Sequence, residues 1–111
     1  MQLNEYQDKA KETAEYPSDN RKGLDYCLLG LSGEIGELAQ LRKRELRGDF
    51  SISDLRNNYD KYISEIGDVL WYLSLLCHEL DVTLENVAQY NLDKLADRKE
   101  RGVIKGSGDD R

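Results

Sequence analysis

The chain has 111 residues, which is the usual length of a single domain. Its 22 acidic and 16 basic side chains give a formal net charge of −6, so long DNA or RNA is excluded as an expected partner. The first residues lack the basic and apolar segments of a signal peptide, and no apolar run reaches the roughly 18 residues of a membrane helix. We therefore expect a cytoplasmic protein with no membrane partner.

Apolar residues recur at intervals of three and four and proline occurs once, which predicts an all-α fold. A first helix is expected over about Asn4–Glu15, followed by a polar loop over residues 17–23. A second helix is expected over about Leu24–Leu46 and ends at Gly48. Its apolar stripe is predicted to face the core and consists of Leu24, Cys27, Leu28, Leu31, Ile35, Leu38 and Leu41.

A third helix is predicted from a cap at Ser53 or Asp54 to about Leu80, and a fourth from a cap at Thr83 to Gly102. One side of the third helix is also predicted to face the core, through Tyr59, Tyr62, Ile66, Val69, Leu73, Leu76 and Leu80. Residues 1–104 thus form one helical domain, and residues 105–111 are expected to be a flexible tail. Both cysteines, Cys27 and Cys77, are interpreted as buried free thiols, and His78 as a helix-end or surface residue.

Two acidic pairs share one pattern, Glu34-Ile-Gly-Glu37 in the second helix and Glu65-Ile-Gly-Asp68 in the third. A spacing of three places both acids of a pair on one helix face, so two packed helices would bring four carboxylates together. Oxygen ligands without His or Cys favour Mg²⁺, or Mn²⁺, over zinc. The alternative is an acidic face that binds no metal, as we expect for the same spacing at Glu5/Asp8, Glu12/Glu15 and Asp97/Glu100.

Glycines precede three of these acids, at Gly33, Gly36 and Gly67. A glycine inside a helix costs about 0.5–1 kcal/mol relative to alanine, so a compensating reason is expected. One interpretation is space for metal, water and phosphate beside the backbone. The other is a close helix crossing, with Gly30 in the same series.

Two further groups are candidates for nucleotide contacts. Tyr72 lies four residues after Asp68, where its ring could stack on a base or sugar or could be an ordinary core aromatic. Trp71 is interpreted as a packing residue. One face of the fourth helix could meet phosphate and sugar, or could pair with neighbouring acids, through Asn91, Lys94, Arg98 and Arg101.

At these residues the sequence resembles the MazG-like family of all-α nucleotide pyrophosphohydrolases, whose signature is an ExxE pair followed one helix later by an ExxD pair. The resemblance extends from Tyr6-Gln7 to Gly-Ser-Gly-Asp109 and so covers nearly the whole chain. That ending is similar to short stand-alone members from phages or mobile elements. The resemblance implies a four-helix MazG-like bundle completed by assembly into a homodimer, or a homotetramer built from dimers.

The resemblance also implies a reaction, the hydrolysis of a (deoxy)nucleoside triphosphate to its monophosphate and pyrophosphate. Mg²⁺ held by all four acids, Glu34, Glu37, Glu65 and Asp68, would orient water for attack at the α-phosphorus. We interpret Glu37 as the acceptor of the water's proton, with Glu34 beside it. Family similarity favours Asn91 and Lys94 as ligand contacts. The alternative function is a non-catalytic, acidic, helical interaction protein.

Overall fold

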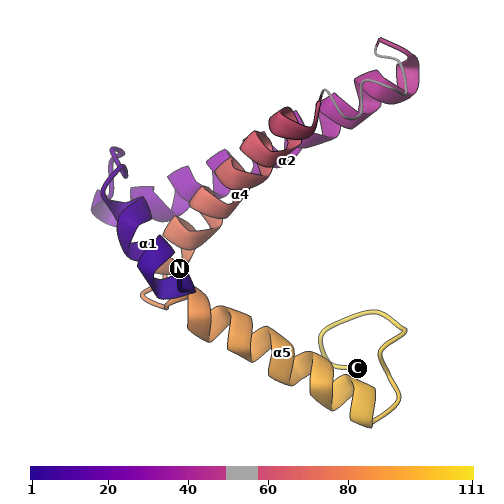
Figure 1. Ribbon diagram of the computed structural model, residues 1–111. Coiled ribbons are helices and arrows are strands. Elements are labelled where there is room, and N and C mark those ends of the chain that lie inside the picture. Colours follow the sequence, from indigo (N-terminus) through magenta and orange to yellow (C-terminus); the bar gives the residue numbers. More distant parts are fainter. Residues whose placement is uncertain (50–57) are drawn as a thin grey trace.

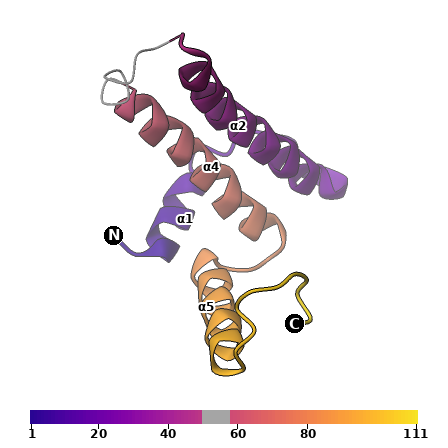
Figure 2. The same cartoon turned by 90° about the vertical axis from the view of Figure 1, so that its right-hand side faces the viewer.

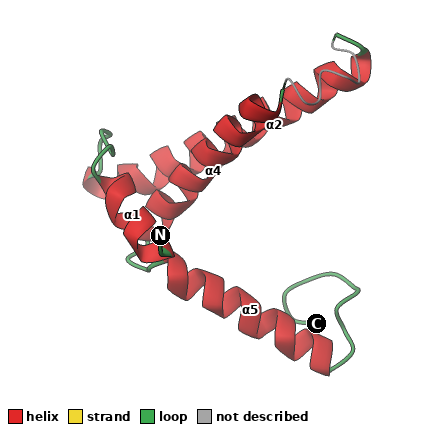
Figure 3. Ribbon diagram, in the orientation of Figure 1, coloured by secondary structure: helices red, strands yellow, loops and turns green. Residues whose placement is uncertain are grey.

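The structure is a computed structural model that describes residues 1–49 and 58–111, and its regular elements are all helical (Figure 3). In chain order they are α1 (Leu3–Lys11), the short 3₁₀ helix η1 (Asp19–Arg21), α2 (Lys22–Arg47), α4 (Tyr59–Glu79) and α5 (Leu84–Glu100). The predicted all-α class is confirmed. None of the helices in the described ranges combines the length and apolarity needed to cross a bilayer.

Helices α2 and α4 lie side by side as an antiparallel hairpin, and α1 packs against one end of it (Figures 1 and 2). From that same end α5 leads away from the hairpin as a separate arm (Figure 1). The radius of gyration is 17.2 Å. A compact chain of this length would have a radius of about 13 Å. The single chain is therefore more open than a compact domain.

Three predicted helix boundaries are confirmed by their hydrogen bonds. Gly48 and Gly102 have φ angles of 91° and 72°, which favour glycine. In both cases the N–H groups of the glycine and of the next residue donate to carbonyls in the last helical turn. At the start of α5, the Thr83 hydroxyl oxygen accepts the Asn86 N–H at 3.1 Å.

The prediction for the first helix is wrong at its end, because α1 stops at Lys11 rather than Glu15. The Thr13 hydroxyl donates to the Ala10 carbonyl at 3.1 Å and accepts the Trp71 indole N–H at 2.9 Å. A threonine side chain that bonds its own backbone competes with the helical pattern, and the chain tightens here into turns. The expected caps Ser53 and Asp54 lie outside the described residues.

A small core lies where α1 meets the hairpin and consists of Ala10, Cys27 and Leu75. Partly buried side chains surround it, namely Tyr6, Ala14, Tyr16, Trp71, Tyr72 and Leu76. The expectation that Cys27 and Cys77 are buried free thiols is confirmed.

The prediction that the whole apolar stripes of α2 and α4 form the core is wrong for a single chain. Ile35 is 51% exposed, Ile66 50% and Leu73 37%. The reason is the path of α5, which does not lie along the hairpin (Figure 1). These side chains therefore remain available to another surface.

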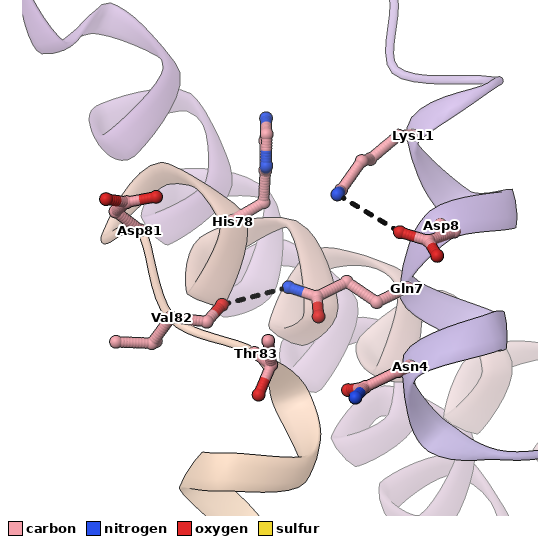
Figure 4. Close-up of a pocket in the computed structure, with 8 residues that line it drawn as sticks. All are labelled: Asn4, Gln7, Asp8, Lys11, His78, Asp81, Val82 and Thr83. Carbon is pink, nitrogen blue, oxygen red and sulfur yellow. Dashed lines mark hydrogen bonds and ion pairs between the residues drawn. The ribbon is translucent and has the colours of Figure 1, made fainter.

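Gln7 joins α1 to the segment between α4 and α5. Its side-chain amide donates to the carbonyls of Ser74 at 3.2 Å and Val82 at 3.1 Å, and its oxygen accepts the Leu84 N–H at 3.0 Å. The residue is only 4% exposed. Figure 4 shows its bond to Val82 beside His78, whose predicted surface position is confirmed.

Candidate metal centre

Three of the four predicted carboxylates meet between the two helices of the hairpin. Glu34 comes from α2, and Glu65 and Asp68 come from α4; one oxygen of each lies within 4.8 Å of the others. Glu34 and Glu65 are half-buried, whereas Asp68 is exposed. Antiparallel packing of α2 and α4 thus places the two acidic pairs opposite each other. We call these three residues the carboxylate cluster.

Glu37 lies outside the carboxylate cluster, although it follows Glu34 by one helical turn. Its side chain is exposed, so it faces solvent beside the cluster. Its charge still acts on the cluster, because it contributes to the raised pKa of Glu34. The roles of Glu37 as a metal ligand and as a proton acceptor stay predictions.

The surroundings of Glu34 disfavour its charged form. Desolvation raises the pKa of Glu34 most, followed by the charge of Asp68 and the hydrogen bond and charge of Glu65. A cation held among these oxygens would relieve this repulsion. Hard carboxylate oxygens with no nitrogen or sulfur donor among them fit Mg²⁺ or Mn²⁺.

The two interpretations of the glycines apply to different positions. A Cβ atom at Gly30 would lie 2.1 Å from a ring carbon of Tyr72, so Gly30 permits a close approach of α4 to α2. A Cβ atom at Gly33, Gly36 or Gly67 would meet no other described atom within 4 Å. The glycines next to the acids therefore border open space, as expected for a site that admits a ligand.

A family model described as the MazG nucleotide pyrophosphohydrolase domain matches residues 23–103. The chain belongs to this family. It is also 45% identical over 115 aligned positions to Gene 37 protein of Mycobacterium phage L5, with the full length of both chains covered. No solved structure matches it. The predicted MazG-like membership, with a short phage relative, is confirmed.

The MazG match contains the whole carboxylate cluster and also Glu37, Tyr72 and the candidate residues of α5. Helix α1, with Gln7, and the tail after Val103 lie outside it. The carboxylate cluster therefore falls within the part of the chain that defines the family.

Tyr72 is packed as the core interpretation expected, and its stacking on a base or sugar stays a prediction. Its ring packs over Gly30 and lies 4.9 Å from the Trp71 ring and 6.3 Å from the Tyr26 ring, between ring centres. Burial raises the pKa of Tyr72 most, and the charge of Glu34 adds to the shift. Tyr72 is thus a packed aromatic next to the carboxylate cluster, and Trp71 packs against the core as expected.

Sequence reasoning missed two residues near the candidate site. Tyr26 stacks on Tyr16 at 4.8 Å between ring centres and extends the aromatic group beside Tyr72. Its position four residues before Gly30, on the same helical face, is the signal that could have identified it. Tyr6 was also missed: burial, and then the charge of Asp68, raise the pKa of its hydroxyl.

A single chain does not bring the candidate face of α5 to the carboxylate cluster, because α5 leads away from the hairpin (Figures 1 and 2). Asn91 and Arg101 are exposed, Lys94 is half-buried and Arg98 is buried. Arg101 pairs with Asp97 at 2.9 Å, as the alternative interpretation expected. Lys94 and Arg98 instead pair with Asp109 in the tail.

The difference between Gly30 and Gly33 predicts opposite effects of alanine. We expect Gly30→Ala to destabilise the fold by about 1–2 kcal/mol, because overpacking against Tyr72 outweighs the gain in helix propensity. Gly33→Ala should be neutral or stabilise by up to about 1 kcal/mol. Urea unfolding of both variants measures the difference. An equal loss of stability in Gly33→Ala would contradict open space at that glycine.

Proposed function

We propose that this MazG-family chain hydrolyses (deoxy)nucleoside triphosphates to the monophosphate and pyrophosphate with Mg²⁺, for which Mn²⁺ can substitute. The observation that carries this proposal is the carboxylate cluster, in which oxygens of Glu34, Glu65 and Asp68 lie within 4.8 Å of one another. Membership of a nucleotide pyrophosphohydrolase family supports the reaction class. A cytoplasmic location, where nucleotides are made and used, is part of the proposal.

In the proposed mechanism three of the acids share one task and Glu37 has another. Glu34, Glu65 and Asp68 would hold the metal ion, which when bound would neutralise phosphate oxygens and make water more acidic. Glu37, exposed beside the cluster, accepts a proton from the attacking water. A bond forms between the water oxygen and the α-phosphorus, the bond to the bridging oxygen breaks, and pyrophosphate leaves.

The proposal includes assembly into a homodimer, or a homotetramer built from dimers. Apolar side chains are exposed on the hairpin, as at Ile35 and Ile66, and on α5, as at Tyr90 and Leu92. A second copy that covers them would bury this surface and could place Asn91 and Lys94 opposite the cluster of its neighbour. Light scattering tests this part, because a monomer at micromolar concentration would contradict it.

The test is product analysis with purified protein, Mg²⁺ and each canonical and modified dNTP in turn. We expect monophosphate and pyrophosphate in equal amounts, and a large loss of turnover in Glu37→Gln. Nucleoside diphosphate with inorganic phosphate would show a different hydrolase. No turnover of any nucleotide, with Glu37→Gln indistinguishable from the unmodified chain, would favour the non-catalytic interaction protein.

A further inference from the structure

The C-terminal tail returns to α5 along a path that its glycines make possible. Gly106 and Gly108 have φ angles of 134° and 85°, a region that other residues rarely adopt. Arg111 donates to the carbonyls of Val103 at 3.3 Å and Ile104 at 3.5 Å, and a third bond joins it to the Gly108 carbonyl. The tail therefore has a defined turn, although its predicted flexibility in solution stays a prediction.

Asp109 is the residue through which this turn contacts α5. The Arg98 guanidinium donates to the Asp109 backbone carbonyl at 3.1 Å and to its carboxylate at 3.3 Å. The same carboxylate oxygen accepts from the Lys94 ammonium at 3.4 Å. The hydrogen bond from Arg98, with smaller contributions from Lys94, holds the pKa of Asp109 below its usual range.

The two cations differ in what they can still bind. The Arg98 side chain is 5% exposed and is paired with Asp109, so it offers little to a ligand from solvent. The Lys94 side chain is 32% exposed and keeps donors that face solvent. Because Arg98 balances the charge of Asp109, the three residues together retain one positive charge, which is available at Lys94.

We propose that Asp109 is a positioning residue that holds the Lys94 ammonium in place for a substrate phosphate. This inference rests on the proposed function, in which Lys94 contacts the triphosphate. A free lysine side chain has four rotatable bonds and loses much of that freedom when it binds. Asp109 restricts Lys94 beforehand, so less freedom is lost on binding. The tail then belongs to the phosphate-binding site.

Asp109→Asn tests the proposal, with Asp110→Asn as the matched control. Asp110→Asn removes the same charge one residue later. Asp110 has no hydrogen bond or ion pair with the described residues. We expect Asp109→Asn to raise the KM for the nucleotide about three- to tenfold while kcat stays within twofold. Asp109→Glu, which keeps the carboxylate, should recover part of the loss. In a Lys94→Gln background, Asp109→Asn should add nothing.

Calorimetry with inorganic triphosphate separates this inference from the proposed function, because it needs no turnover. A Kd that rises in Asp109→Asn but not in Asp110→Asn supports positioning even if no nucleotide is hydrolysed. Tighter binding in Asp109→Asn would overturn it, since the carboxylate would then compete with phosphate for Lys94. An unchanged Kd, or no triphosphate binding by the unmodified chain, would also overturn it.

Discussion

Glu65→Gln is expected to lower the rate of Mg²⁺-dependent pyrophosphate release roughly 100-fold or more. The change removes one of the three carboxylates that α2 and α4 bring within 4.8 Å of one another. An amide oxygen carries no charge, so the cation loses affinity and the phosphate oxygens lose neutralisation. A loss of about 3 kcal/mol of transition-state stabilisation corresponds to this factor. Release of pyrophosphate from dNTP at saturating Mg²⁺ measures it.

Glu12→Gln is the matched control for Glu65→Gln. Glu12 belongs to an acidic pair with the same spacing, Glu12/Glu15, but it is exposed at the end of α1 and is not part of the carboxylate cluster. Its replacement should change the rate by less than about twofold. Full activity of Glu65→Gln in a correctly folded protein, or an equal loss in Glu12→Gln, would contradict the assignment of the cluster.

Gln7→Ala is expected to destabilise the fold by about 2–4 kcal/mol, the largest stability effect that we predict. Gln7 is 4% exposed and satisfies the Ser74 and Val82 carbonyls and the Leu84 N–H. Alanine would leave these backbone groups without their partner where water has little access. For a chain of this length the midpoint of thermal unfolding should fall by roughly 10 °C or more.

Asp8→Ala is the control for Gln7, because among the described residues Asp8 makes only an exposed ion pair with Lys11 in the same helix. It should cost less than about 1 kcal/mol. Both variants are compared at one protein concentration, since assembly would make the midpoint depend on concentration. If Gln7→Ala and Asp8→Ala unfold at the same temperature, Gln7 does not join α1 to the rest of the chain.

The sequence predicted the fold class and all three residues of the carboxylate cluster, together with Glu37, which lies outside it, because both predictions depend on short-range periodicity. Helical spacing places Glu65 and Asp68 on one face wherever the helix packs. Spacing alone does not say which acid of the Glu34/Glu37 pair turns toward the other helix. That depends on the rotation of α2 against α4, and the close approach of Tyr72 to Gly30 sets this rotation.

Other features depended on contacts between distant residues and could not be predicted from spacing. The partners of Asp109 lie 11 and 15 residues away across a non-helical turn. Gln7 bonds groups 67 to 77 residues further along the chain. The apolar stripes of α2 and α4 were interpreted as the core, because periodicity shows that a helix face is apolar but not what packs against it.

Binding of Mn²⁺ to the nucleotide-free protein, followed by electron paramagnetic resonance, tests most directly whether Glu34, Glu65 and Asp68 share a cation. We predict saturable Mn²⁺ binding that Mg²⁺ displaces, and a loss of affinity of at least roughly tenfold in Glu34→Gln and in Glu65→Gln. Glu12→Gln should bind as the unmodified chain does. Equal Mn²⁺ affinity in all four proteins, or no saturable binding, would contradict a metal centre between α2 and α4.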